Sequence, residues 1–235
     1  MPRSETRLDK RRALVLFDID GTLLRGAGPH HKQALIDGIR RVTGVETHLN
    51  GVATAGMLDR DLILHMLKAS GYADRRSRAA LRQIVDACQD AYLHNCAADL
   101  STAVCAGAAE LLEELTGKGA AIGLVTGNLS GIGWKKVELA GLRRYFFVGA
   151  FAEDGLTRRR LARIAWQRAR KAGLIGQDAS VSLIGDHMND VEAAKANGFR
   201  AIAVASGLTP AHELEKSQPD ILVQSLCELN VNQLV

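Results

Sequence analysis

The chain of 235 residues is long enough for one domain or for a domain with an insertion, and its 47% hydrophobic content is ample for a packed core. Its formal net charge of +4 raises the question of a nucleic-acid partner, but the basic residues are scattered and only 4% of residues are aromatic. These features favour solvated basic faces and leave a weak general attraction for anionic substrates.

The four cysteines and the polar N-terminus predict a cytoplasmic protein. Cys88, Cys96, Cys105 and Cys227 form no Cys-x-x-Cys pair or regular framework, which predicts reduced, mostly buried thiols. No apolar h-region follows the N-terminus, so we expect no signal peptide, and no apolar run approaches the ~18 residues that a membrane span requires. The sequence does not indicate an oligomeric state.

The first predicted element is a buried strand that delivers two aspartates. Ala13 to Phe17 are all apolar, which is typical of a central strand in a parallel sheet. Asp18 and Asp20 follow two positions apart, so they begin on the same side of the chain, at the carboxyl end where open α/β sheets bind ligands. Two acids there repel unless a cation or a proton relieves the repulsion. The alternative is a simple polar turn, in which Asp and Gly are common.

A helical segment follows a link rich in glycine and proline over residues 25–29. No strand-like alternation interrupts it. Three amphipathic stripes indicate three helices: Leu35, Ile39 and Val42; Leu62, Ile63, Met66 and Leu67; Leu81, Ile84, Val85, Cys88 and Tyr92.

After residue 101, short apolar runs alternate with amphipathic segments. We expect strands at 121–125, 146–151, 181–185, 201–205 and 221–223, and helices at 108–115, 134–140, 161–171, 190–196 and 210–215. Such alternation implies right-handed crossovers and a parallel sheet. The predicted fold is therefore an α/β, Rossmann-like parallel-sheet core (residues 1–26 and 102–235) with an α-helical cap (residues 27–101) inserted after the first strand.

Two further strands end in polar residues. Thr126, Gly127 and Asn128 follow the run 121–125, and Asp186 and Asp190 follow the run 181–185. Each has a structural alternative: Thr126 could cap the next helix, and Asp190 could be a helix N-terminal acid favoured by the dipole. Three strand ends with these side chains, in this order, form a much stronger signal than any one of them.

The three motifs together resemble the haloacid dehalogenase superfamily, in particular its phosphoglycolate-phosphatase-like subgroup with an inserted helical cap. The segments that carry the resemblance are Asp18-Ile19-Asp20-Gly21-Thr22-Leu23, Val125-Thr126-Gly127-Asn128 and Gly185-Asp186-His187-Met188-Asn189-Asp190. The resemblance implies a Mg²⁺-dependent phosphatase that hydrolyses a small phosphate monoester through an aspartyl-phosphate.

The resemblance also implies a role for each acid. Asp18 would attack phosphorus and bind Mg²⁺ through its other oxygen. Asp20 would protonate the leaving oxygen, then activate water, and its backbone carbonyl would contact the metal. Asp186 would complete the ligands, and Asp190 would be an outer ligand or orient a lysine. We expect the four acids to converge.

The phosphoryl oxygens would be held by the second motif. This role falls to the hydroxyl of Thr126 and to backbone N–H groups around Gly127 and Asn128. His187 reads as an exposed loop residue, whereas Asn189 could either touch the site or remain outside it.

The cation that braces the phosphoryl group is ambiguous. Many relatives place a Lys-Pro pair before the helix that leads to the last motif, but residues 153–160 contain neither residue. Lys136, in the helix after Thr126, is the first candidate, because a phosphatase subgroup has a lysine there. Arg158 is the second and Lys135 the third, and a plain surface lysine is the alternative.

A helical cap of this size usually closes over small phosphorylated metabolites such as phosphoglycolate or a sugar phosphate. Arg60 could reach from the cap to an anionic substrate group, or it could pair with Asp59 or Asp61. His30 and His31, at the start of the first cap helix, read as solvated.

Competing functions differ in what they require. Dehalogenases of the superfamily lack the second aspartate, so Asp20 argues against that reaction. A phosphonate-cleaving relative needs a Schiff-base lysine in the cap, and nothing marks Lys32 or Lys68 for that role. A phosphomutase and a polynucleotide 5′/3′-phosphatase stay open as alternatives. A non-catalytic phosphate-binding module is the least favoured, since every acid that the chemistry needs is present.

Overall fold

The computed structural model describes residues 11–235 except 50, 51, 53, 97 and 98, so residues 1–10 of the predicted core lie outside the described residues. Its strands are β1 (Arg11–Phe17), β2 (Ala121–Val125), β3 (Val148–Ala150), β4 (Ile175–Gly185), β5 (Arg200–Val204) and β6 (Ile221–Val223). Its α-helices are α1 (Gly28–Thr43), α2 (Asp59–Ala69), α3 (Asp74–Asn95), α4 (Ala108–Gly117), α5 (Ser130–Leu139), α6 (Arg158–Lys171), α7 (Met188–Lys195) and α8 (Ala211–Lys216).

The strands form one six-stranded sheet in the order β3-β2-β1-β4-β5-β6, and every pairing is parallel. Strand β1 lies at the centre, with Phe17 opposite both Leu124 of β2 and Ile184 of β4. The carboxyl ends of β1, β2 and β4 are therefore neighbours. The predicted α/β class and parallel sheet are confirmed.

Alternate residues of β1 pack against opposite helical layers. Leu14 and Leu16 belong to the cluster that contains α6 and α7, whereas Val15 and Phe17 belong to the cluster that contains α4. Because β1 is covered on both faces, its sequence is a continuous apolar run rather than an alternating one.

Strand β4 is the main difference from the expected boundaries, since it begins at Ile175 rather than at 181. Its first half, Gly176 to Ser180, is polar and largely exposed, so no apolar run marks it. This half reaches past the buried part of the sheet to pair Ile175 with Arg11, across a register shift in β1.

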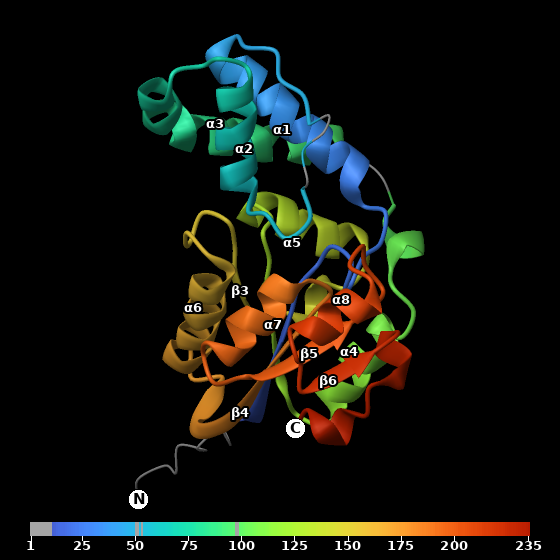
Figure 1. Cartoon of the computed structure of the whole chain (residues 1–235). Coiled ribbons are helices and arrows are strands. Elements are labelled where there is room, and N and C mark those ends of the chain that lie inside the picture. The colour runs from blue at the N-terminus through green and yellow to red at the C-terminus, as the bar shows by residue number, and fades with distance from the viewer. Residues whose placement is uncertain (1–10, 50–51, 53, 97–98) are drawn as a thin grey trace, which may run out of the picture.

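Helices α1 to α3 lie between β1 and β2 in the sequence and above the carboxyl ends of the strands in space (Figure 1). The three predicted stripes supply most of their large buried side chains, including Ile39, Ile63 and Ile84, whereas Val42 and Leu81 are only partly buried. Helices α1 and α3 pack so closely at Gly38 that a Cβ on this residue would clash with the backbone of Cys88. Glycine, which has no Cβ, permits this approach.

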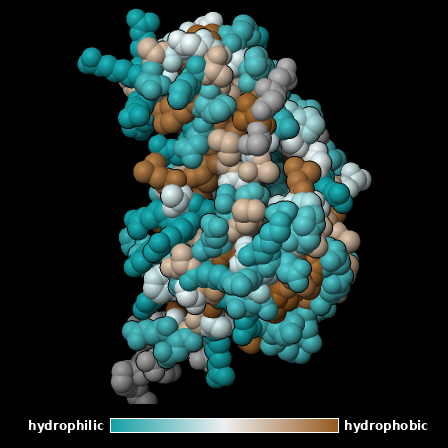
Figure 2. Space-filling model, in the orientation of Figure 1, coloured by the Kyte–Doolittle hydropathy of each residue, from teal (hydrophilic) through white to brown (hydrophobic). Residues whose placement is uncertain are grey.

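The hydrophilic surface and the mostly buried cysteines agree with the expectations from the sequence. Figure 2 shows a mostly hydrophilic face, with apolar side chains gathered around the level where α1 to α3 meet the sheet. Among the described residues, no helix has the length and apolarity to span a bilayer. Cys88, Cys96 and Cys105 are buried, Cys227 is exposed, and all four are free thiols.

Candidate active site

Three polar residues that follow neighbouring strands line one cavity. Asp18 follows β1, Thr126 follows β2 and Asp186 follows β4, and together they line a cavity of about 460 Å³ beneath α1 and α2. The backbone N–H of Asp18 donates to the carbonyl of Ile184 at 3.0 Å, which extends the β1–β4 ladder up to the site. Sheet topology alone therefore brings these three side chains together.

Two glycines form a tight seat for Asp186. A Cβ at Gly207, or at Gly21, would overlap the carboxylate of Asp186. Gly21 also has φ of +90°, a conformation that glycine adopts without strain. The hydroxyl of Ser206 donates to the carbonyl of Gly21 at 2.7 Å and joins the two loops. The backbone thus fixes this carboxylate from two sides.

Asp18, Asp186 and Asp190 form a buried group that we call the acid cluster. One carboxylate oxygen from each lies within 4.8 Å of the others. The guanidinium of Arg158 enters this cluster: Nη1 donates to Asp18 Oδ1 at 3.1 Å, and Nε lies 3.2 Å from Asp190 Oδ1. Among the described residues, neither oxygen of Asp190 has a hydrogen bond of good geometry. One guanidinium therefore contacts two of the three buried acids.

Burial, followed by the charges of the neighbouring groups, shifts pKa values in the acid cluster. Burial, together with the charge of Asp18, raises the pKa of Asp186 to about 7. Burial also raises the pKa of Asp190 well above its usual range. Burial opposes the charged form of Arg158, but Asp18 and Asp190 raise its pKa overall. The cluster must hold extra protons or bind a cation. Three buried carboxylates whose oxygens lie this close together suit a hard divalent ion such as Mg²⁺.

Asp20 lines the same cavity as Asp18 and Asp186, but its carboxylate is not part of the acid cluster. Lys136 Nζ donates to Asp20 Oδ2 at 2.6 Å and to Oδ1 at 2.8 Å, and Asn128 Nδ2 donates to Oδ2 at 2.8 Å. Burial opposes the charged form, but the charge and hydrogen bonds of Lys136, together with the hydrogen bond from Asn128, lower the pKa of Asp20 overall. A competing cation therefore draws Asp20 to the other side of the cavity. The role that the resemblance gives to its backbone carbonyl concerns a different atom and stays a prediction.

Lys136 is fully buried and is not the plain surface lysine of the alternative interpretation. Besides Asp20, its ammonium group contacts Asn128 Oδ1 at 2.7 Å and His31 Nδ1 at 3.1 Å. We call these four residues the lysine network. Lys135, one position earlier in α5, points outward and pairs with Glu138 at 3.2 Å.

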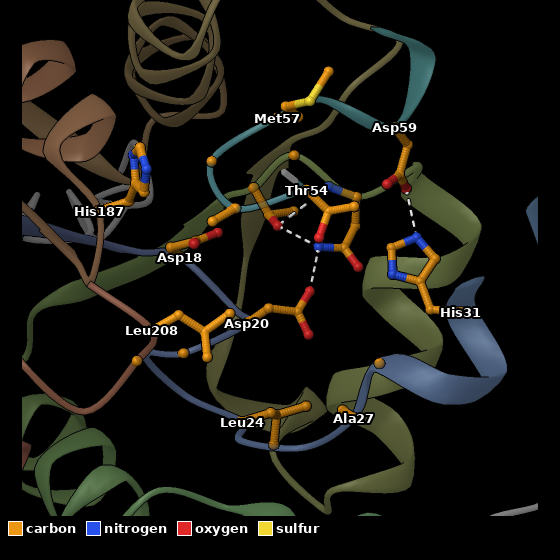
Figure 3. Close-up of a pocket in the computed structure, with 18 of the residues that line it drawn as sticks. Asp18, Asp20, Leu24, Ala27, His31, Thr54, Met57, Asp59, His187 and Leu208 are labelled. Atoms are coloured by element: carbon orange, nitrogen blue, oxygen red, sulfur yellow. Dashed lines mark hydrogen bonds and ion pairs between the residues drawn. The ribbon is translucent and has the colours of Figure 1, made fainter. Parts of the chain in front are cut away.

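His31 and Asp59 come from the helical segment, and the sequence interpretation missed both. His31 was expected to be solvated, but its side chain is only 13% exposed, and its Nε2 lies 2.8 Å from Asp59 Oδ2 (Figure 3). The same Asp59 oxygen accepts from the backbone N–H of Leu129 at 2.7 Å. His30 is exposed, as expected. No local pattern marks the partners, which lie far apart in the sequence.

The helical segment also touches the core through backbone groups. The N–H of Asp59 donates to the carbonyl of Gly127 at 2.8 Å, and Asn189 Nδ2 donates to the carbonyl of Gly56 at 3.0 Å. A Cβ at Gly56 would clash with His187, and one at Gly127 would crowd the carbonyl of Met57. These close approaches place residues 54–58 over the cavity.

Asn189 and His187 have distinct positions. Asn189 contacts the helical segment and does not line the cavity, whereas His187 does line it. His187 is also the N-cap of α7, accepting from the N–H of Asn189 at 3.1 Å. Burial, followed by the charge of Arg158, lowers the pKa of His187.

Two more candidate residues can be placed. Thr126 Oγ1 accepts from Asn128 Nδ2 at 2.7 Å, and α5 begins only at Ser130 without a side-chain cap, so Thr126 does not cap that helix. Arg60 does not line the cavity, and its Nε lies 4.0 Å from Asp61.

A family model for haloacid dehalogenase-like hydrolases matches residues 13–198. The chain is 27% identical to a phosphoglycolate phosphatase of Pseudomonas fluorescens over 219 residues, which cover 91% of this chain and 76% of that enzyme.

Solved structures share the fold. A predicted phosphatase from Clostridium acetobutylicum has a TM-score of 0.67 at 21% identity, covering 96% of this chain and 99% of its own. A β-phosphoglucomutase from Clostridium difficile has a TM-score of 0.70 at 18% identity, covering 95% of each chain. At these identities, the likeness concerns the fold alone.

Proposed function

The chain belongs to the haloacid dehalogenase-like hydrolase family, and we propose that it is a phosphatase that hydrolyses small phosphate monoesters through an aspartyl-phosphate on Asp18. One observation carries the proposal: a buried carboxylate at the end of β1 faces the cavity with a guanidinium on one oxygen, while a second carboxylate two residues on is held separately. In-line phosphoryl transfer needs a nucleophile of this kind and a distinct proton donor.

The acid cluster fits a divalent cation, and we assign Mg²⁺ to Asp18, Asp186 and Asp190. The support is the closeness of the three buried carboxylates, the two Asp190 oxygens that have no hydrogen bond of good geometry among the described residues, and the raised pKa values of Asp186 and Asp190. When bound, Mg²⁺ would neutralise charge on the phosphoryl oxygens and help to orient them.

In the first step, a carboxylate oxygen of Asp18 attacks phosphorus, and the bond from phosphorus to the ester oxygen breaks. Asp20 gives a proton to that oxygen, and the alcohol leaves. In the second step, Asp20 removes a proton from water as the water oxygen attacks the phosphorus of the aspartyl-phosphate. The bond from phosphorus to the Asp18 oxygen breaks and phosphate leaves, so Asp18 is again a carboxylate and Asp20 again carries the proton that it gave in the first step.

The two buried cations receive different roles. Arg158 contacts the proposed nucleophile, so we assign to it the brace that compensates charge on Asp18 and on the phosphoryl group. Lys136, the first candidate on sequence, contacts Asp20 instead, so we propose that it holds the proton donor. The hydroxyl of Thr126 and the N–H groups of Gly127 and Asn128 would hold the phosphoryl oxygens.

We propose that residues 27–101 are a cap domain and residues 1–26 with 102–235 the core. Helices α1 to α3 pack on one another, and α1 and α2 roof the cavity; this arrangement favours small substrates over polymers. The P. fluorescens relative is a phosphoglycolate phosphatase, so phosphoglycolate and sugar phosphates are the first substrates to test. A cytoplasmic location stays a prediction.

The test is a screen of small phosphate esters with Mg²⁺, scored by inorganic phosphate release. Wild type should release phosphate and Asp18→Asn should not. Transfer of phosphate between sugar hydroxyls without release would favour a phosphomutase. Strong competition by phosphorylated oligonucleotides would favour a polynucleotide phosphatase. No release from any ester, with well-folded protein, would overturn the proposal.

A further inference from the structure

The contacts of His31 fix which of its ring nitrogens carries the proton. Lys136 has only donors to offer, so His31 Nδ1, 3.1 Å from Lys136 Nζ, must accept through a lone pair. A neutral ring then carries its proton on Nε2, which donates to Asp59 Oδ2 at 2.8 Å. A doubly protonated ring would present an N–H to the ammonium group of Lys136.

The carboxylate of Asp59 contacts both the His31 ring in the helical segment and a backbone N–H group in the core. Its Oδ2 accepts from both His31 and the N–H of Leu129, and its side chain is only 3% exposed. Leu129 directly follows Asn128, which contacts Asp20. A continuous chain of contacts thus runs from α2 and α1 through Lys136 to Asp20.

We propose that His31 and Asp59 are positioning residues that hold Lys136 on Asp20. The same contacts then fix both the position of the helical segment on the core and the orientation of Asp20. This inference rests on the proposed function, in which Asp20 is the proton donor. Neither His31 nor Asp59 would touch the phosphoryl group, so both would act through Lys136.

The helical segment offers a matched control in Gln89 of α3. Gln89 Oε1 accepts from the N–H of Gly131 at 2.6 Å and from the hydroxyl of Ser130 at 3.2 Å. This contact also joins the helical segment to the start of α5, but none of its three residues lines the cavity. Gln89→Ala therefore removes a docking contact without disturbing Lys136.

The kinetic test compares an alkyl phosphate, whose alkoxide leaves poorly, with nitrophenyl phosphate, whose leaving group barely needs a proton. His31→Ala should lower kcat/KM for the alkyl ester about 10- to 100-fold, the usual range for losing a hydrogen bond to a charged group. The loss for nitrophenyl phosphate should be clearly smaller. His31→Gln should retain most of the activity, because an amide can accept from Lys136 and donate to Asp59.

A double-mutant cycle tests whether the two residues act together. Asp59→Ala should produce the same ester-dependent loss, and the double variant with His31→Ala should be no worse than the poorer single variant. Gln89→Ala should affect both esters equally. If His31→Ala also affects both esters equally, or if His31→Gln does not restore activity, His31 is only a docking contact and the inference is wrong.

The ring itself gives a readout that does not need activity. Two-bond ¹H–¹⁵N correlations at pH 7, with the His31 signals identified by their loss in His31→Gln, should show a neutral ring with its proton on Nε2. An imidazolium, or a proton on Nδ1, would contradict the contact with Lys136. If no ester is hydrolysed, the proposed function fails while this measurement still decides the contact.

Discussion

The two halves of the candidate site treat buried charge in opposite ways. In the acid cluster, one guanidinium contacts two of the three carboxylates, and both oxygens of Asp190 lack a hydrogen bond of good geometry among the described residues. In the lysine network, the ammonium group of Lys136 has a partner on every side, and the carboxylate of Asp20 has both oxygens satisfied. The difference teaches that a deficit of positive charge marks where a ligand binds, whereas a balanced network marks where a group is positioned.

The largest expected effect is in the acid cluster. Asp18→Asn removes the proposed nucleophile and should lower phosphate release by about 10⁴-fold or more with every ester. The measurement is phosphate release under saturating Mg²⁺, with a thermal melt to show that the variant folds. Residual turnover close to that of wild type would mean that another group attacks phosphorus.

The matching change in the lysine network should divide the reaction into its two steps. Asp20→Asn should lower turnover of a sugar phosphate by about 10²–10⁴-fold, because the leaving alkoxide receives no proton. With nitrophenyl phosphate it should release one equivalent of phenolate in a burst and then stall as an aspartyl-phosphate. Rapid mixing and trapping of acid-stable phosphoprotein measure this. Equal losses for both esters, with no burst, would show that Asp20 is not the acid and base.

Removing each of the two buried cations separately sharpens the comparison. Arg158→Ala should lower kcat/KM about 10²–10³-fold with both esters, because a preorganised charge at the nucleophile is lost. Lys136→Ala should cost more with a sugar phosphate than with nitrophenyl phosphate, since it would act through Asp20. Lys135→Ala, on the exposed face of the same helix, is the control and should resemble wild type. If Lys136→Ala were the more damaging change with both esters, the sequence-based choice of Lys136 as the brace would be correct.

The smallest expected effect concerns stability. Asp186 has its pKa raised from 3.8 to about 7, so the metal-free folded chain holds a proton that the unfolded chain loses near pH 4. This contribution to stability is full below about pH 4 and is lost as the pH rises through 7. As the pH is raised from 5 to 7.5, the melting temperature of Asp186→Asn should therefore increase relative to that of metal-free wild type.

Mg²⁺ should oppose the same loss of stability at neutral pH. At about 100 times its dissociation constant, it would add about 2.7 kcal/mol, or about 5–10 °C for a chain of this size. Melts of wild type with Mg²⁺ and with chelator measure the shift, and Asp186→Asn should show a smaller one. Identical melts with full activity in chelator would contradict the metal assignment.

The sequence predicted the positions of the side chains that follow the ends of strands. A continuous apolar run, followed by a polar residue, placed Asp18, Thr126 and Asp186 at one edge of a parallel sheet. These positions follow from β-strand periodicity and crossover rules, which act locally and are therefore visible in a single sequence.

The pairing of charges could not be predicted in this way. Whether Lys136 or Arg158 reaches Asp18 depends on how α5 and α6 pack on the sheet, and each is more than a hundred residues from its partner. His31 carries no local signal, because its environment is made by α2 and α5. Polar contacts between distant elements arise only after the chain has folded.

The dock between the helical segment and the core uses main-chain atoms of Gly56, Met57, Asp59 and Gly127. These contacts depend on the path of the main chain, so substitutions in α1 to α3 away from His31, Asp59 and Gln89 should leave them intact. The residues that line the roof can therefore diverge while the contacts with the core persist. A protein engineer could exploit this by exchanging residues 27–101 between relatives as a cassette, retaining Gly56, Gly127, Asp59, His31 and Gln89 at the seam.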